Sequence, residues 1–581
     1  MFKKSLPIAV ILTMVMALLP SGFALAQRDA DVTLTSVMRQ EEPITWYGVT
    51  ALEISSFDPQ RAQTRYDIDA TEQLFLGLTD INPLNPNEVR PELATSWETS
   101  EDGTMWTFTL RNDVNWVRWD PVSDTAEIVR PVTAADVAFG IKRSCDPRLG
   151  AYYTAVSASV IQGCNDVASK PVEEVTDADY DLVQVEALDD TTLVVNLQFA
   201  AGYFFSMTPM WMLRPVPQET IAEFGDDWTD VGNIVTNGAW VLDEYVRGVR
   251  RVYLRNPHLP ADMFGPGNVE RVIYTVVEDG GTQFALYLDK QADVGPLLTA
   301  EQQAVQDDPE LSQQVVQVVD PSVGYIGLAH DKAPTDNVNV RRALGAMISR
   351  DALASQILQG RGMPVIHFTP PGMFGAPPIN EVGVGFDPEF AQAQLAEAGY
   401  PNCEGLPNIE FVNTGGRTPE FIVAQAEANL GCNRDIFTLE TVDFTVMIEL
   451  TDPRNATEDR PNMWSIAWGP DYPDAQNWVG DVLHCESENT FKRPCSEVDD
   501  LIEQAARESD PDARVELYYR IEEMFFGPEG EHPIIPLYTF LTTYMVQPWA
   551  TIPIATDGLV GGAHYDWRSV DVAMREAAMG E

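Results

Sequence analysis

Apolar and polar side chains alternate along several segments in the first half of the chain, and this period of two predicts strands. The clearest segment is 104–111, TMWTFTLR, which follows a turn. Strands are also predicted at 191–199 and 269–277. Residues 68–78 instead carry apolar side chains at helical spacing. A further helix is predicted to begin after Thr133, because a Thr with an acid three residues on is typical of a helix N-terminus.

The second half of the chain mixes the same two periods. Helices are predicted at residues 282–292, 338–358, 388–399 and 496–526. Strands or extended segments are predicted at residues 408–412, 436–442 and 534–546. Pro and Gly crowd residues 364–388, which predicts a long loop. Strands alternate with helices on both sides of a change near residues 278–281, and this pattern predicts two α/β lobes.

The length of the chain, 581 residues, also indicates several domains. A single hydrophobic core rarely grows beyond ~250–300 residues. Hydrophobic residues make up 45% and charged residues 22% of the chain, which are ordinary values for globular proteins. Intrinsic disorder is therefore not expected as the main description of this chain, despite its high net charge.

Residues 1–26 have the features of a secretory signal. Lys3 and Lys4 are followed by the mostly apolar run 6–19, and the small-residue site 24–26 predicts cleavage before Gln27. The apolar run is shorter than the ~20 residues that span a bilayer. The first Cys of the chain is at position 145, so no lipid-anchoring Cys follows the signal. We therefore expect a soluble exported protein.

The chain has six cysteines, and an even number in an exported protein favours disulfides. They fall into three local couples, and sequence proximity predicts pairing within each: Cys145 with Cys164, Cys403 with Cys432, and Cys485 with Cys495. His484 precedes one of them, but a single His beside a single Cys is a weak zinc signal. We predict no metal site and no cofactor.

The charge balance excludes several classes of partner. The chain carries 88 Asp and Glu against 37 Lys and Arg, a formal net charge of −51. Nucleic-acid binding needs a basic surface, and docking on anionic lipids needs the same. The acidity is instead typical of a soluble, self-repelling surface, and a preference for cationic ligands or a saline habitat are alternative explanations.

Sequence motifs of common enzymes are absent. The chain has no H-E-x-x-H, no G-x-S-x-G and no phosphate-binding G-x-x-x-x-G-K-[ST]. A triad assembled in space, or a pair of carboxylates acting as in glycosidases, is not excluded by sequence spacing. Because acidic residues are so abundant, a carboxylate pair alone is weak evidence, and we predict that the protein is not an enzyme.

Several phrases, in order along the chain, carry a family resemblance. They are SFDPQRAQTRYDIDATEQLFLGL, RPELATSWETSEDGTMWTFTLRNDVNW, PVTAADVAFGIKR, FGDDWTDVGNIVTNGAW, NVRRALGAMISRDAL and SIAWGPDYPDAQNW. With them the chain resembles the solute-binding proteins of peptide-class ABC importers, the oligopeptide and dipeptide binders of extracellular solute-binding protein family 5. The resemblance covers nearly the whole chain after the signal. After Trp116 an insertion departs from the family pattern, as does the loop after Cys145.

The resemblance implies an α/β fold of the periplasmic-binding-protein type. Two lobes would be joined by two hinge crossings, near 277–281 and 544–548. Lobe 1 would comprise residues 27–278 and 547–581, with a small inserted domain at about 76–190. Lobe 2 would comprise residues 279–546. A ligand would be enclosed between the lobes by a hinge motion.

The resemblance also implies a function. The protein would be a periplasmic monomer that captures short peptides and delivers them to the permease and ATPase subunits of an ABC importer. Asp471 occupies the family position that binds the α-amine of the ligand. Burying an amine requires a fixed anion, and a carboxylate supplies charge-assisted hydrogen bonds.

Other ligand contacts follow from the same resemblance. Strand-like recognition of the peptide backbone is expected from Gln63, Thr64 and Arg65 in lobe 1 and from Ala467, Trp468 and Gly469 in lobe 2. Tyr153 matches a Tyr that contacts ligand through its hydroxyl group. Lys332 and Arg417 are candidates for the peptide carboxylate, and Trp46, Trp211 and Trp468 for side-chain pockets. Where the family has an Arg before the Asp loop, this chain has Ser465, which weakens the case for one fixed peptide length.

Alternatives remain open at this point. The same fold binds other solutes, such as nickel chelates, haem, oligosaccharides or opines. An exported hydrolase that uses carboxylates is a less favoured class. A signalling or chaperone role for the same binder is not excluded by the sequence.

Overall fold

The structure is a computed structural model that describes residues 42–487, 489–553 and 564–580. The predicted signal segment, residues 1–26, lies outside the described residues. Strands from the first part of the chain build several small sheets, and strands from the later part build one large sheet.

The principal sheet of the first part has four strands in the order β1-β13-β12-β11. They are β1 (Thr45–Thr50), β13 (Arg271–Val276), β12 (Arg250–Arg255) and β11 (Trp240–Val246). The short strands β21 (Ala550–Thr551) and β22 (Ser569–Val570) form a pair near the end of the chain. The predicted strand at 269–277 is thereby confirmed as β13.

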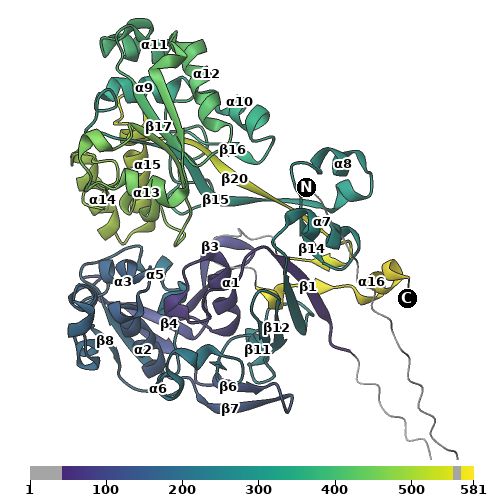
Figure 1. Ribbon diagram of the computed structural model, residues 1–581. Coiled ribbons are helices and arrows are strands. Elements are labelled where there is room, and N and C mark those ends of the chain that lie inside the picture. Colours follow the sequence, from purple (N-terminus) through teal and green to yellow (C-terminus); the bar gives the residue numbers. More distant parts are fainter. Residues whose placement is uncertain (1–41, 488, 554–563, 581) are drawn as a thin grey trace, which may run out of the picture. The chain divides into compact units, whose positions relative to one another are not determined.

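The part of the chain between β1 and β11 in sequence builds smaller sheets. One has the order β4-β5-β9-β8: Ala94–Thr99, Met105–Leu110, Thr192–Asn196 and Val185–Ala187. The others join β2 (Thr79–Asn82) to β3 (Asn85–Pro91), and β10 (Val235–Thr236) to β6 (Asn115–Asp120) and β7 (Thr125–Pro131). The insertion after Trp116 therefore folds as the β6–β7 hairpin. In Figure 1, β4 and β8 lie to the left of β11, and β6 and β7 lie below it.

Helices of the first part are short. They are α1 (Arg65–Leu74), α2 (Ala134–Ser144), α3 (Thr154–Val160), α4 (Cys164–Ala168), α5 (Phe204–Met207) and α6 (Gln218–Phe224). The predicted start of α2 is confirmed, because Thr133 and Asp136 form a capping box. The prediction of a helix to residue 78 is too long, since the backbone becomes extended at Phe75.

The large sheet has seven strands in the order β14-β20-β15-β19-β17-β18, with β16 also paired to β20. Their bounds are β14 (Val294–Pro296), β15 (Val315–Leu328), β16 (Gly362–Pro364), β17 (Ile409–Asn413), β18 (Phe437–Thr441), β19 (Met463–Trp468) and β20 (Ile534–Val546). The predicted strands at 408–412, 436–442 and 534–546 are confirmed. The long strand β15 was not predicted.

Most helices of the later part gather around this sheet, whereas α16 lies apart from them, near β1 (Figure 1). The helices of this part are α7 (Gly280–Leu288), α8 (Gln302–Asp307), α9 (Val338–Ala346), α10 (Arg350–Ala352), α11 (Pro388–Glu397), α12 (Thr418–Leu430), α13 (Phe444–Thr451), α14 (Glu497–Arg507), α15 (Pro511–Phe526) and, near the C-terminus, α16 (Val572–Met579). Two predicted helices are each divided. The first is interrupted between α9 and α10, and the second between α14 and α15, where Asp510 caps the new helix and Pro511 takes its first position.

Hydrophobic cores cover both faces of the large sheet. On β15, Ile326 and Leu328 belong to a cluster with α9, α11 and α12. Val323 and Tyr325 belong to a second cluster, which includes α14 and α15. Because neighbouring side chains of a strand point to opposite faces, the two clusters lie on opposite sides of the sheet. The later part is therefore an α/β unit with three layers. The alternating pattern predicted an α/β lobe here but not the number of layers.

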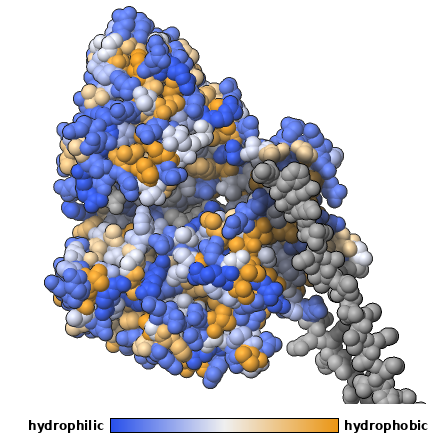
Figure 2. Space-filling view, viewed as in Figure 1, coloured by the Kyte–Doolittle hydropathy of each residue, from blue (hydrophilic) through white to orange (hydrophobic). Residues whose placement is uncertain are grey.

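Three disulfides join the cysteines in the predicted couples. The Cα atoms are 5.2 Å apart in Cys145–Cys164, 4.9 Å in Cys403–Cys432 and 5.0 Å in Cys485–Cys495. Figure 2 shows that apolar side chains on one face of the molecule are interspersed with hydrophilic ones. Within the described ranges, no helix combines the length and the apolarity needed to cross a membrane.

Candidate functional site

One edge of the large sheet collects most of the residues predicted in lobe 2. Strands β17, β18 and β19 are parallel, so their carboxyl ends meet at this edge. Strand β15 is antiparallel to β19, and Val323 of β15 pairs with Trp468, the last residue of β19. The loop that carries Asp471 begins here, and the loop that carries Arg417 begins at the end of β17. The topology therefore brings these two predicted residues to the same edge.

Asp471 is held by the side chain of Asn477. The Asp471 amide donates to Asn477 Oδ1 at 2.9 Å, and Asn477 Nδ2 donates to Asp471 Oδ2 at 3.3 Å. Trp468 Nε1 also donates to Asn477 Oδ1 at 3.3 Å. Asp471 is 7% exposed, so its carboxyl group is both fixed and nearly removed from water.

The surroundings of Asp471 disfavour its negative charge. Burial, together with the charge of Asp481, raises the pKa of Asp471 to about 7, although hydrogen bonds from Asn477 and Tyr153 act in the opposite direction. Asp481 itself receives hydrogen bonds from Tyr472 at 2.7 Å and from Asn477 at 3.0 Å. No cation of the described chain is among the groups that shift the Asp471 pKa. The site thus holds a buried acid that lacks a counter-charge.

Tyr153 reaches Asp471 from the first part of the chain. Its hydroxyl group forms a hydrogen bond with the Asp471 carboxyl group, and its ring packs edge-on against Trp211, with centroids 4.7 Å apart. Burial and the nearby Asp471 raise the pKa of Tyr153, so the hydroxyl stays protonated and acts as a donor. Trp211 is buried, and its Nε1 donates to the carbonyl of Ala62 at 3.0 Å.

The loop after Asp471 is anchored on α15. Asp474 accepts hydrogen bonds from Arg514 Nη2 at 2.8 Å and from the Tyr518 hydroxyl at 3.0 Å. Arg514 Nη1 also donates to the carbonyl of Gly202 at 3.1 Å, and the Gly202 amide donates to the carbonyl of Ala506 at 2.7 Å. These bonds join the segment around Gly202 to the helices behind the Asp471 loop.

The backbone of β19 has an unpaired edge beside Asp471. Strand β17 pairs with β19 only at Met463 and Trp464, whereas β15 pairs with it as far as Trp468. In the described ladders, residues 465–468 therefore lack a strand partner on the β17 side. Ala467 is exposed on this stretch, and a Cβ atom on Gly469 would lie 3.0 Å from Ser322 Oγ. This stretch is the kind of strand edge to which an extended peptide can add by main-chain pairing.

The segment predicted to contact the ligand from lobe 1, residues 63–65, is hydrogen-bonded to Asp67. Thr64 is the N-cap of α1, and its amide donates to Asp67 Oδ2 at 3.0 Å. The amide of Gln63 donates to the same oxygen at 3.4 Å, so neither amide is available to a ligand in this form. Arg65 lies 3.9 Å from the Asp320 carboxylate, which belongs to β15.

The two candidates for the peptide carboxylate lie in different places. Arg417 is exposed and precedes α12, at the same sheet edge as Asp471. Lys332 follows the opposite end of β15, and its Nζ donates to Glu410 at 2.6 Å and to the carbonyl of Glu458 at 3.3 Å. Whether either residue contacts a ligand stays a prediction.

Two cavities lie elsewhere. The larger, about 970 Å³, lies between α2 and α6 and has Arg148, Asp177 and Tyr180 in its wall. It contains none of the predicted site residues. A second cavity of about 390 Å³ is lined by Trp46 and Arg65 among others. Trp46 therefore faces a cavity, whereas Trp468 is half-buried beside Asp471.

Comparison with known proteins defines the family. Residues 88–490 match the family described as bacterial extracellular solute-binding proteins, family 5, middle. The chain belongs to this family. It is 27% identical over 561 residues to the periplasmic oligopeptide-binding protein OppA of Escherichia coli, covering 94% of this chain and 95% of that protein. It is 26% identical over 552 residues to the periplasmic murein peptide-binding protein MppA of the same organism, covering 92% and 94%.

Solved structures of family 5 proteins share the fold. The unliganded open form of the murein tripeptide-binding protein MppA matches with a TM-score of 0.73 at 23% identity, covering 91% of this chain and 98% of that one. Haemophilus influenzae OppA in complex with the peptide RPPGFSPFR matches with a TM-score of 0.66 at 23% identity, covering 91% and 99%. The expected two-lobe α/β fold is thereby confirmed.

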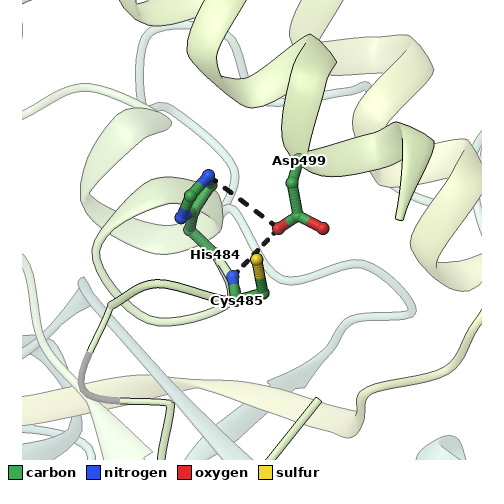
Figure 3. A group of neighbouring side chains, drawn as sticks. All are labelled: His484, Cys485 and Asp499. Carbon is green, nitrogen blue, oxygen red and sulfur yellow. Dashed lines mark hydrogen bonds and ion pairs between the residues drawn. The ribbon is translucent and has the colours of Figure 1, made fainter. Parts of the chain in front are cut away.

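One cluster of side chains contains residue types that bind metals, but one of its members is not free to act as a ligand. His484, Cys485 and Asp499 lie together (Figure 3). The Cys485 sulfur is bonded to Cys495, so it is not a thiolate ligand. Asp499 Oδ1 accepts a hydrogen bond from the Cys485 amide at 2.9 Å and also pairs with Arg493. The cluster therefore stabilises the loop between β19 and α14.

Asn477 and Asp481 were not predicted as site residues. They lie six and ten positions beyond Asp471, and the chain turns tightly at residues 476–480. Asn477 therefore contacts Asp471 directly, and Asp481 is joined to it through Asn477. The sequence does carry one signal for them. Asn477 and Asp481 stand in the largely apolar segment AQNWVGD, and polar side chains in such a segment are expected to be buried and hydrogen-bonded.

Proposed function

We propose that this protein is an exported, periplasmic receptor that captures oligopeptides and delivers them to the permease and ATPase subunits of an ABC importer. It would act as a monomer, without a cofactor and without changing its ligand chemically. The family, and the names of the relatives that cover nearly the whole chain, support this proposal.

The buried carboxyl group of Asp471 is the observation that carries the proposal. A buried carboxylate without a counter-charge is costly, and its raised pKa expresses that cost. The protonated amine of a peptide supplies the missing charge and three hydrogen-bond donors. A neutral sugar would leave the carboxylate unpaired. The site therefore favours ligands that carry a primary amine.

The unpaired edge of β19 suits a ligand of variable sequence. A peptide that extends from Asp471 along residues 465–468 would pair through its main chain, and such pairing does not depend on side-chain identity. The exposed Arg417 flanks the same edge and is well placed for a carboxylate. We propose Arg417 as a charged contact of the ligand.

Two lobes would close around the peptide. We place lobe 1 at residues 27–278 and 547–581, with the small domain at about 76–190 inserted in it, and lobe 2 at 279–546. The separation of the strands into different sheets supports the division into two lobes, since β14 and β20 pair with each other within the proposed lobe 2. The sheet of the small domain extends beyond its proposed end, because β9 (Thr192–Asn196) pairs with β5 and β8. Contacts between Tyr153 and Asp471, and between Gly202 and Ala506, would then join the lobes.

Native mass spectrometry of the freshly purified protein tests this proposal. We expect bound masses that, after release and sequencing, are a mixture of short peptides with free amino termini. A single bound compound that is not a peptide would contradict the proposal.

A further inference from the structure

The cavity of about 390 Å³ contains buried positive charge that the proposed ligand contacts do not use. Its wall combines residues of β1, α1 and β13 with Val318 of β15 and Thr542 and Tyr544 of β20. Arg251 and Arg568 also line it. Both are nearly inaccessible to solvent, with 1% and 4% exposure.

Several guanidinium nitrogens in this wall have no hydrogen-bond partner. They are Nε and Nη1 of Arg251 and Nε of Arg568. Arg251 lies over the ring of Tyr274, 4.7 Å from its centroid, and Arg568 Nη1 donates to the Tyr274 hydroxyl at 2.9 Å. Aromatic rings attract a cation through their faces, but they leave in-plane N–H donors unsatisfied.

Positive charge exceeds negative charge around the cavity. Arg65, Arg251 and Arg568 line it, and Asp69 is the acidic residue among the described lining residues. Asp69 accepts a hydrogen bond from Tyr565 at 2.7 Å, and its charge also attracts both Arg251 and Arg568, so one carboxylate faces two buried guanidinium groups. Arg65 is near Asp320 at 3.9 Å. In a chain with a net charge of −51, a buried excess of cations is unusual and costly unless an anion pairs with it.

We propose that this cavity binds a carboxylate group of the captured peptide, through Arg251 and Arg568. A carboxylate accepts charge-assisted hydrogen bonds from guanidinium groups, and the unpaired N–H groups of the two arginines supply separate donors for its two oxygens. The inference rests on the proposed function and adds a preference to it: peptides that place an acid at this position bind more tightly.

The cavity lies within reach of a peptide anchored at Asp471. Val323 pairs with Trp468, beside Asp471, and Val318 in the cavity wall is five residues earlier on β15. At ~3.3 Å per residue this is roughly 16 Å, which about five residues of an extended peptide cover. Arg65 lines the cavity and approaches Asp320, so it lies between the two sites. The carboxylate is therefore a side chain or the terminus of a ligand of about this length.

Calorimetric titration of the whole protein, freed of bound ligand, tests the preference. The probes are pentaalanine, pentaalanine amide, and two sets of amidated pentapeptides that carry Glu or Gln at each position in turn. We expect at least one acid to bind tenfold or more tightly than its neutral counterpart. The Glu and Gln pairs identify a side-chain acid, and the first two probes identify the terminus. Equal affinities throughout would overturn the inference while the proposed function stands; no binding of any peptide would contradict the proposed function itself.

A matched pair of variants locates the effect. Thr542 lines the cavity, and Thr543 follows it on the opposite face of β20. Thr542→Glu should place a carboxylate in the cavity, so that acidic and neutral peptides bind this variant with about equal affinity. Thr543→Glu should keep the tenfold preference for the acidic peptide. Neither variant removes a buried arginine, so folding is not at risk from an orphaned partner. An acid preference that survives in Thr542→Glu would place the carboxylate elsewhere. Saturable binding of acetate alone, without a preference among peptides, would also overturn the inference.

Discussion

Asn477 binds both the amide and the carboxyl group of Asp471, at 2.9 and 3.3 Å. This pairing fixes the position of the acid but does not neutralise it, because a side-chain amide carries no charge. The carboxyl group is therefore ready for a cation before any ligand is present. Such preorganisation reduces the cost of ordering the site when a ligand binds.

Removal of the Asp471 charge should abolish most of the affinity for peptides. We expect Asp471→Asn to lose about 2–5 kcal/mol of binding free energy, roughly 30- to 5000-fold, as for other buried charge pairs that lose one partner. Calorimetric titration with a pentapeptide measures the loss. Asp443→Asn is the matched control, because Asp443 is exposed at the end of β18, at the same sheet edge. Unchanged affinity in a folded Asp471→Asn variant would refute the amine contact.

Peptide binding should release a proton at acidic pH. The pKa of Asp471 is about 7 in the ligand-free protein, and an adjacent ammonium group should lower it. Below pH 7 the acid is protonated and must ionise on binding, so affinity should fall roughly tenfold per pH unit. Titrations in buffers of different ionisation enthalpy count the protons. A binding constant that is independent of pH between 5.5 and 7 would contradict this assignment.

The carboxyl group of Asp471 should make the ligand-free protein less stable as the pH rises. Its pKa in the folded protein is raised above the unfolded value, so its stabilising contribution is complete below about pH 4 and is lost as the pH rises through 7. Ligand-free Asp471→Asn should therefore gain stability relative to the unmodified protein at pH 8 but not at pH 4. Thermal melting at the two pH values measures the difference. A relative stability that rises toward low pH would contradict the prediction.

Gly202 should be required for close approach to α14 and α15. A Cβ atom there would lie 2.1 Å from the carbonyl oxygen of Glu508, a backbone atom that cannot turn away. Gly202→Ala should therefore separate the two segments, lose hydrogen bonds worth about 1–3 kcal/mol in total, and weaken peptide binding. Titration and small-angle scattering with peptide report affinity and closure. Gly385→Ala is the control, because nothing lies within 4 Å of its Cβ position.

Of the three disulfides, Cys403–Cys432 should contribute most to the free energy of unfolding. It closes the longest loop, with a sequence separation of 29 against 19 and 10 for the others. A longer closed loop removes more entropy from the unfolded chain, so its loss should cost about 2–4 kcal/mol. Urea unfolding of the Cys403→Ala and Cys432→Ala double variant, beside the corresponding double variants of the other two couples, tests the order. An equal loss of stability in the three variants would contradict it.

Local signals in the sequence predicted much of the fold. The capping box at Thr133 and the alternation at 104–111 act over a few residues, and both are confirmed as α2 and β5. The division between α14 and α15 was missed, although Asp510-Pro511 is a helix-start signal, because the apolar period continues across it. Strand β15 was missed because its register depends on β19 and β20, which lie more than a hundred residues away.

The candidate site was less accessible to sequence reasoning. Asp471 was predicted from a motif, but its raised pKa depends on burial and on Asp481, which only the folded chain reveals. Lys332 was predicted as a ligand contact, and no local pattern indicated that Glu410, 78 residues away, would bind its ammonium group. The Arg251–Arg568 cavity joins segments more than three hundred residues apart. Contacts of this kind follow from topology and not from spacing.

The central claim is that a buried carboxyl group at Asp471 selects the free amine of a peptide. The most direct test is a pair of titrations of the same protein, with pentaalanine and with N-acetyl-pentaalanine at pH 7.5. Acetylation removes the charge of the amine and leaves the remaining backbone unchanged. We expect the acetylated peptide to bind at least a hundredfold more weakly. Equal affinity for the two peptides would show that Asp471 does not bind the amine, and the account of the site would be wrong.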